Sequence, residues 1–272
     1  MRVHTLAASV VLACGAPSPP APVQPPTREV RAVLAPGAAR YQVRSHLYVE
    51  QDVGGRIQES RLDLAYFVSA DLASDTAGAM IASLVLDSVT RFEGNAATAT
   101  DFRRAHGSRF SGRLSPTGDL AELSGGDSTV RFLRELTDEL RLFFPRLPPG
   151  GASPGTTWVD TTEQRSTSSG IPLSIRQITE HRVGDPEARE GALTFPIRRR
   201  TTYTFGGTGT QGGQEFQVAG SGRRSTVEFL SVEGRYLGLV TADTSTFTIT
   251  LGVASLEIPG RQTRADTVSV VP

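Results

Sequence analysis

The sequence predicts a mainly β protein, built on one long, antiparallel, curved sheet with a single main helix packed on it. Three observations predict this fold. Segments in which apolar and polar residues alternate recur along most of the chain, with turn residues between them. One stretch, residues 127–144, has the apolar spacing of an amphipathic helix. Helical segments do not alternate with strands as parallel βαβ units require, so the sheet should be antiparallel.

The first residues have the layout of a secretory signal. An apolar run over residues 6–13 follows Arg2 and precedes Cys14, the only cysteine. We therefore expect residues 1–13 to be a signal peptide. The run 11–14, Val-Leu-Ala-Cys, resembles the bacterial lipobox, which implies lipid attachment at Cys14; an ordinary secretion signal with an incidental cysteine is the alternative. By resemblance to lipoprotein sorting, Gly15 favours the outer membrane, with the protein facing the periplasm.

The proline-rich residues that follow Cys14 are expected to form an extended tether over residues 14–39. A single β-rich domain is expected over residues 40–272. Its strands are predicted near residues 41–51, 57–70, 79–92, 108–114, 119–123, 156–168, 171–183, 191–205, 214–230, 235–251 and 255–271.

A weak internal repeat is visible in the turns of this domain. Residues 114–118 match residues 230–234 at an offset of 116 positions. The match indicates either two repeated β-rich halves or a chance similarity between hairpins.

The predicted helix over residues 127–144 carries an apolar stripe and ends before Pro145. A stripe of this kind has to lie on an apolar surface, and the sheet is the surface that the chain offers. Two interpretations follow: the helix seals one face of the sheet, or it covers a ligand cavity. In the second interpretation the cavity would be lined by Leu133, Leu136, Leu140 and Phe143.

Two motifs occur in contexts that argue against their usual chemistry. Residues 151–155 fit the G-x-S-x-G pattern of a nucleophile elbow, but Pro154 lacks the backbone N–H that the oxyanion hole needs. Residues 207–212 fit the G-x-G-x-x-G pattern, but a strand pattern follows where the dinucleotide site needs a helix. A glycine-rich hairpin loop is expected there instead.

The remaining polar residues do not form a recognisable catalytic or metal pattern. His46, His106 and His181 lack ligand spacing and are expected on exposed strand faces. Asp243 and Glu228 are expected in turns or on an outer face. No catalytic residue, cofactor or metal site is predicted, and the balance of 28 basic and 28 acidic residues gives no electrostatic reason for nucleic-acid binding.

Together with Leu147-Pro148 and the run Gly155-Thr156-Thr157-Trp158, the N-terminus resembles a group of uncharacterised bacterial envelope lipoproteins. Members carry a Pro-containing link and a Gly that lead into a Thr-Trp strand; the link here is longer and richer in Gly. More loosely, long strands closed by one helix resemble the half-barrel of lipoprotein carriers and lipid-binding envelope proteins. This resemblance implies that the helix lies against the concave face.

We therefore expect a non-enzymatic outer-membrane lipoprotein, anchored to the membrane by its N-terminal lipid. It would bind a lipid-like or other hydrophobic ligand between helix and sheet. The alternative is a structural or interaction scaffold that binds another envelope protein through a strand edge or a Thr-rich face. An enzyme is the weakest hypothesis, because no site has suitable residues in a supportive context.

Overall fold

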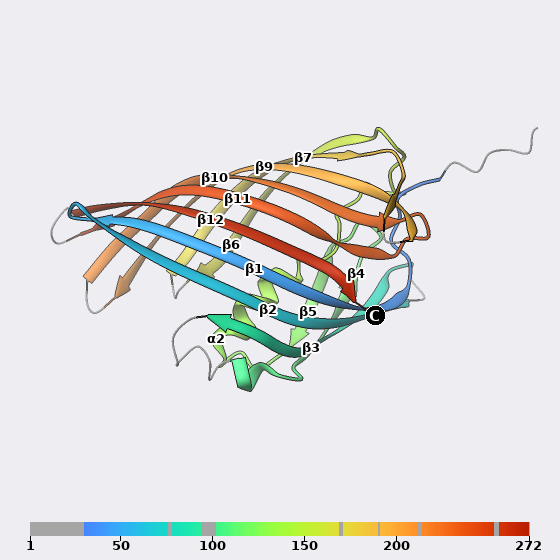
Figure 1. The fold of residues 1–272 in the computed structure, drawn as a ribbon, viewed down its shortest axis with the longest axis horizontal. Coiled ribbons are helices and arrows are strands. Elements are labelled where there is room, and N and C mark those ends of the chain that lie inside the picture. The colour runs from blue at the N-terminus through green and yellow to red at the C-terminus, as the bar shows by residue number, and fades with distance from the viewer. Residues whose placement is uncertain are drawn as a thin grey trace, which may run out of the picture.

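The computed structural model of the chain describes residues 30–75, 78–93, 102–168, 171–189, 191–211, 214–252 and 256–271. The predicted signal peptide, Cys14 and most of the predicted tether lie outside these ranges. Within them, twelve strands form one antiparallel sheet that curves strongly (Figure 1). The predicted antiparallel sheet is confirmed.

The strands follow the alternating pattern of the sequence closely. Their bounds are β1 (Gly37–Val53), β2 (Arg56–Ser74), β3 (Met80–Glu93), β4 (Arg109–Leu114), β5 (Leu120–Gly125), β6 (Thr157–Ser168), β7 (Ile171–Val183), β8 (Glu187–Arg189), β9 (Ala192–Gln211), β10 (Gln214–Ser231), β11 (Tyr236–Leu251) and β12 (Leu256–Val271). The short strand β8 was not predicted. The G-x-G-x-x-G motif also differs from the prediction, because Gly207 and Gly209 lie inside β9 and not in a loop.

The strand order is β5-β4-β3-β2-β1-β12-β11-β10-β9-β7-β6, and β8 pairs with β9. The first and last strands of the chain pair with each other, while β5 and β6 form the two edges of an open sheet. The β1–β2 hairpin turns over Gly54 and Gly55, whose φ angles are 62° and 83°. Two positive φ values in a two-residue turn are the requirement of a type I′ hairpin, which glycine meets without strain.

The helix α2 (Arg131–Leu140) is shorter than the predicted helix over residues 127–144. Asp127 accepts a hydrogen bond from the Thr129 backbone N–H at 2.9 Å in the turn before the helix. At the other end, the Phe143 N–H donates to the Leu140 carbonyl at 3.2 Å, which tightens the last turn. Pro145 favours an extended conformation at Phe144, so the helix could not continue past that residue.

We call the face of the sheet on which α2 lies the inner face. The helix buries Phe132, Leu133, Leu136 and Leu140. The ring of Phe132 meets Tyr66 of β2 edge to face at 6.1 Å between centroids, and Phe143 meets Tyr41 of β1 at 5.1 Å. The main hydrophobic core therefore sits between the inner face and the segment that carries α2.

Part of the predicted tether lies against the body. Ala32 is fully buried, and its backbone pairs with Ala152 through N–H to O bonds of 2.8 and 3.1 Å. Strand β1 begins at Gly37, three positions before the predicted start of the domain at residue 40. Residues from 30 onward therefore pack on the body, next to the turn that carries the G-x-S-x-G motif.

The two turns of the proposed repeat share their hydrogen bonds. In both, the first serine N–H donates to a carbonyl four positions on, Asp119 in one turn and Arg235 in the other, at 2.9 and 2.8 Å. The strands on either side differ: six residues each in β4 and β5, but 18 and 16 in β10 and β11. The likeness is established for the turns, and two repeated halves stay a prediction.

Replacing Leu133 by Ala tests the packing of α2. Leu133 is 1% exposed, so the substitution should lower the free energy of unfolding by about 2–5 kcal/mol through lost burial and a new cavity. Leu142, 36% exposed just beyond the helix, is the matched control, and Leu142→Ala should cost much less. Urea unfolding followed by circular dichroism measures both; equal costs would contradict the packing of this helix.

Candidate functional site

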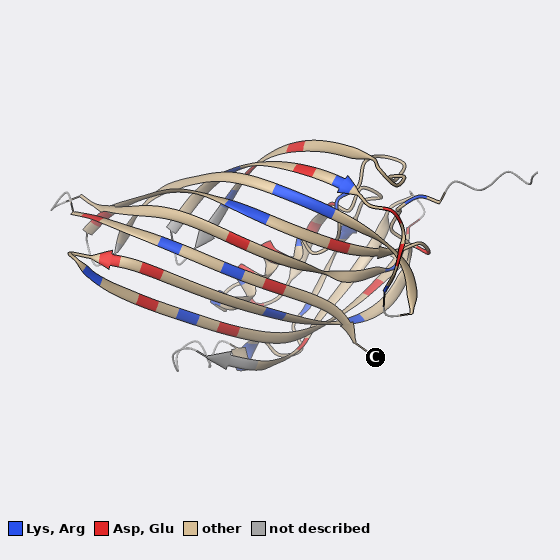
Figure 2. Ribbon diagram, turned by 45° about the horizontal axis from the view of Figure 1, so that its top comes forward, with Lys and Arg blue, Asp and Glu red and all other residues tan. Residues whose placement is uncertain are grey.

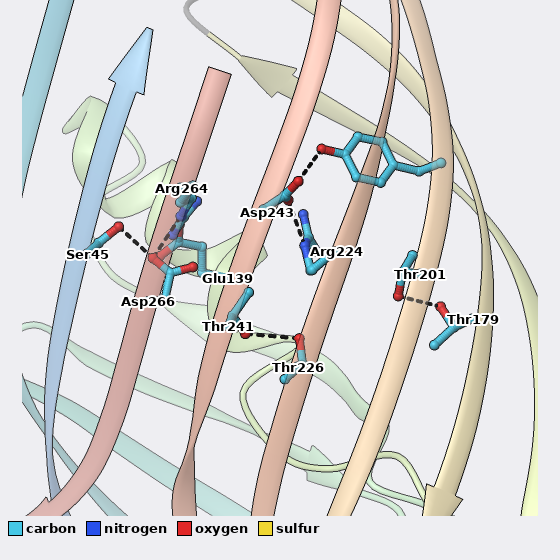
Figure 3. A network of polar contacts seen from close by, with 11 residues as sticks. Ser45, Glu139, Thr179, Thr201, Arg224, Thr226, Thr241, Asp243, Arg264 and Asp266 are labelled. Carbon is cyan, nitrogen blue, oxygen red and sulfur yellow. Dashed lines mark hydrogen bonds and ion pairs between the residues drawn. The ribbon is translucent and has the colours of Figure 1, made fainter. Parts of the chain in front are cut away.

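The inner face carries a band of polar side chains between two apolar zones. These side chains come from β1, β7, β9, β10, β11 and β12, and they lie in adjacent rows across the sheet (Figure 3). We call the band the polar belt; its members are Ser45, Thr179, Thr201, Tyr203, Arg224, Thr226, Thr241, Asp243, Arg264 and Asp266.

Strand register explains why residues so far apart in the sequence lie side by side. Ser45 lies opposite Asp266, Asp266 opposite Thr241, and Thr241 opposite Thr226. Directly opposed residues in antiparallel strands point to the same face, so their side chains form a continuous row. The row is hydrogen-bonded: the hydroxyls of Thr226 and Thr241 are 2.9 Å apart.

The centre of the belt is an acid held by two donors. Arg224 donates from Nε to Asp243 Oδ2 at 2.8 Å, and the Tyr203 hydroxyl donates to Asp243 Oδ1 at 2.6 Å. The Asp243 side chain is only 5% exposed, whereas Arg224 is 34% exposed. Burial and the hydrogen bond to Asp243 raise the pKa of Tyr203 to about 12, so its hydroxyl stays a donor at neutral pH.

A second cluster joins the belt to the helix. Arg264 donates from Nε to Asp266 at 2.8 Å and from Nη2 to Glu139 of α2 at 2.7 Å. The Ser45 hydroxyl donates to the same Asp266 oxygen at 2.6 Å. Burial acts to lower the pKa of the Arg264 guanidinium, but Glu139 and Asp266 outweigh it and the pKa is raised. The pairing therefore fixes the position of α2 over β12.

A buried charged group lies beside the belt on the core side. Arg199 Nη1 is 3.2 Å from Glu228 Oε1, and the Glu228 side chain is fully buried. His181 Nε2 is 3.0 Å from Asp160 Oδ2, and its ring stacks on Trp158 at 4.6 Å between centroids. Burial raises the pKa of Glu228 and lowers the pKa of His181.

Three sequence predictions are wrong at these positions. His181 is buried, although an exposed strand position was expected, and His46 is exposed as expected. Glu228 and Asp243 are buried on the inner face and do not lie in turns or on the outer face. Each of the three residues lies on the inward side of its strand. A polar or charged partner on a neighbouring strand offsets the cost of burying it.

Beyond the belt, toward the β1–β2 turn, the inner sides of β1, β9, β10 and β11 carry apolar side chains that are only half-buried. We call this zone the distal inner face; its members are Leu47, Val49, Phe205, Phe216, Phe247, Ile249 and Leu251. In contrast to the core end, these side chains keep part of their surface accessible.

Aromatic rings lie flat on this zone because glycines face them. A Cβ atom added at Gly220 would come within 2.5 Å of the Phe205 ring, and one at Gly209 within 2.6 Å of the Phe216 ring. The Phe247 ring covers Gly260 in the same way. A ring lying across the backbone of the next strand projects little into the arch, so these glycines keep the inner surface smooth.

The residues predicted to line a cavity lie in the core. Leu133, Leu136, Leu140 and Phe143 are all buried at the core end of the inner face. They line neither of two surface hollows, one of about 880 Å³ beside Arg40, Arg109 and Arg235 and one of about 560 Å³ on a Thr-rich part of the outer face. A cavity lined by the four residues stays a prediction.

The site residues that sequence reasoning missed are Tyr203, Arg224, Asp243 and Arg264. One signal was present: Asp243 has the same parity as Phe247, Ile249 and Leu251, so it had to share their face. An acid on an otherwise apolar face indicates a partner on a neighbouring strand. Among the described residues, no group of three or more His, Cys, Asp or Glu side chains could hold a metal ion.

No protein-family model, curated protein or solved structure matches this chain. No helix within the described ranges is long and apolar enough to cross a membrane. Charges of both signs are spread along the strands (Figure 2). The geometry of the inner face is therefore the basis for inferring a function.

The buried His181 predicts a pH-dependent stability. Its pKa is lowered in the folded protein, so below about pH 6.5 the unfolded chain takes up a proton that the folded chain does not. Stability should fall as the pH drops through that value, and His181→Phe, which keeps the stacking on Trp158, should reduce this fall. The oppositely shifted Glu228 is present in both proteins and cancels in the comparison.

Urea unfolding at about pH 7.5 and about pH 5.5 measures the effect. Thr179→Val, on the same face of the same strand, removes a hydroxyl but no titrating group and should keep the wild-type pH dependence. If wild type and His181→Phe lose the same stability on acidification, His181 does not control it.

Proposed function

We propose that this protein binds a lipid-like, hydrophobic ligand on the distal inner face and does not transform it chemically. One observation carries the proposal: the apolar side chains of this face are only half-buried and share the inner face of the curved sheet. At the core end, α2 and the residues after it cover the inner face. At the distal end, Phe216, Phe247 and Ile249 remain partly accessible.

Burial of apolar surface supplies the driving force. Removing apolar surface from water contributes roughly 25 cal/mol per Å², so an alkyl chain along this face would gain several kcal/mol. Contiguous accessible apolar surface on a protein typically marks a ligand or partner site. The flat rings of Phe205 and Phe216 offer a smooth surface that suits a flexible chain better than one rigid shape.

This proposal moves the ligand away from the space between helix and sheet. Under α2 and the residues that follow it, the rings of Tyr41, Phe143, Phe144 and Tyr236 contact one another edge to face or tilted, at 5.1–5.9 Å between centroids. Aromatic side chains therefore occupy the inner face there. The polar belt, joined to the helix through Glu139, marks the boundary at which we place the inner end of the ligand.

We also propose that the protein is an outer-membrane lipoprotein anchored through Cys14 and facing the periplasm. The lipobox-like run 11–14 and the resemblance to half-barrel envelope proteins support this. Residues 30–36 lie near the core end, where Ala32 pairs with Ala152. A chain that leads from an N-terminal anchor would thus enter the body at its core end.

A specific observation also favours the second function, a scaffold that binds another envelope protein. The outer hollow of about 560 Å³ is lined by Thr202, Thr204, Thr244 and Thr246 together with Arg223. Hydroxyls and a guanidinium around a hollow suit a polar protein surface. A defined partner cross-linked from this outer face, with no hydrophobic probe bound on the inner face, would favour the scaffold over the ligand carrier.

Replacing Ile249 by Asp tests the ligand face. A carboxylate on the distal inner face should weaken binding of the uncharged fluorescent probe N-phenyl-1-naphthylamine by at least about tenfold, because a charge resists burial against an alkyl or aryl surface. Thr250→Asp places the same charge on the opposite face of the same strand and should leave binding unchanged. Probe titration, with circular dichroism as the folding check, measures both; equal probe affinity in the two variants would contradict the proposal.

Replacing Cys14 by Ala tests the anchor. In a bacterial host fed a labelled fatty-acid precursor, the wild-type protein should be labelled and recovered with membranes. Cys14→Ala should lose the label and move to the soluble envelope fraction. Persistent labelling of the variant would show that the lipid is not attached at this cysteine.

A further inference from the structure

We propose that the ligand of the distal inner face is a single-chain amphiphile with an anionic head, and that Arg224 binds the head. This inference rests on the proposed function and names its ligand class. It places the head at the polar belt and the chain along the distal inner face. The inner end of the site would therefore select the head, and the apolar zone would accept the chain.

The hydrogen bonds of Arg224 leave part of its guanidinium available. Nε is bonded to Asp243, and the guanidinium carbon lies 5.6 Å from the centre of the Tyr203 ring. Within the described ranges, Nη1 and Nη2 of Arg224 have no hydrogen-bond partner, and the side chain is 34% exposed. These terminal nitrogens are donors on an inward-facing side chain that keeps about a third of its surface accessible.

The acid that orients Arg224 is itself fully engaged. Both Asp243 oxygens accept hydrogen bonds, from Arg224 and Tyr203, and the carboxylate is 5% exposed. The ligand therefore meets the cationic partner of this pair and not the anionic one. In Arg264, by contrast, Nε and Nη2 are already bonded to Asp266 and Glu139, so Arg224 is the residue to which we assign the head.

Strand β10 connects this guanidinium to the apolar zone without a change of face. The residues on the inner side between Arg224 and Phe216 are Gly222, Gly220 and Val218. Eight positions separate Arg224 from Phe216, which at the strand rise corresponds to about 26 Å. An extended chain that starts at Arg224 would first cross the ring of Phe205, which lies opposite Gly220, and a longer chain would go on to the ring of Phe216.

The chemistry favours an anion over a neutral or cationic head. A guanidinium presents parallel N–H groups that match a carboxylate or phosphate, and charge-assisted hydrogen bonds are roughly twice as strong as neutral ones. Because the Arg224 side chain is only 34% exposed, screening by water is reduced and this attraction is strengthened. A quaternary ammonium head would meet the same guanidinium as a like charge.

Competition against N-phenyl-1-naphthylamine tests the assignment. Dodecanoate, dodecanol and dodecyltrimethylammonium share one chain and differ in the head; acetate supplies the head without the chain. We expect dodecanoate to compete best and acetate not to compete. Arg224→Gln should weaken the binding of dodecanoate by about 10- to 100-fold, because a charge-assisted hydrogen-bonded pair is lost. The binding of dodecanol should stay unchanged.

Arg223→Gln is the matched control, because Arg223 is the adjacent residue on the outer face and lines the Thr-rich hollow. It should bind dodecanoate as the wild type does. Arg224→Lys keeps the cation and should retain an intermediate preference for dodecanoate, which keeps the test decisive if Arg224→Gln fails to fold.

Equal competition by the three dodecyl compounds in the wild type would overturn the anionic head while leaving the hydrophobic ligand in place. An equal loss of dodecanoate affinity in the Arg223 and Arg224 variants would do the same. Competition by acetate alone at the same concentration would show a free-anion site and overturn the amphiphile. Failure of the wild type to bind the probe and every chain would overturn the proposed function itself.

Discussion

The pairing of Asp243 with Arg224 and Tyr203 is the interaction on which the inner face depends. A lone carboxylate on the inward side of β11 would carry a large desolvation cost, and two donors, Arg224 of the adjacent β10 and Tyr203 of β9, offset it. Because Asp243 finds its hydrogen-bond donors within the sheet, the polar belt can lie between two apolar zones. One of these zones becomes the core and the other remains accessible.

The same principle explains how the helix closes only part of the sheet. Phe132, Leu133 and Leu136 bury the apolar side of α2 at the core end, while Glu139 meets Arg264 where the belt begins. A helix of ten residues covers about 15 Å, whereas the longest strands extend much further. The distal part of each long strand therefore extends past the helix and keeps its inward side half-buried.

Most of the fold could be predicted from the sequence, because strand alternation and turn residues are local signals. The bounds of β1 to β7 and of β9 to β12 lie within a few residues of the predicted ranges, except that β9 continues beyond residue 205. The belt could not be predicted in the same way. Whether Asp243, Glu228 and His181 face inward with a partner depends on the strands that pair beside them, and a single sequence does not contain that order. Parity could have placed Asp243 on the face of Phe247, where the sequence analysis did not put it, but the compensating Arg224 becomes visible only in the register.

Photolabelling with an alkyl chain that carries a diazirine would test the central claim most directly, since it reports where a chain lies without assuming the head. After irradiation and peptide mass spectrometry, adducts should concentrate on the inward-facing residues of 214–220 and 245–251, with Thr246 and Thr248 of the outer face unlabelled. Adducts concentrated on the outer face, or on the helix residues 131–144, would contradict a ligand face that begins at the polar belt and runs to the distal end of the sheet.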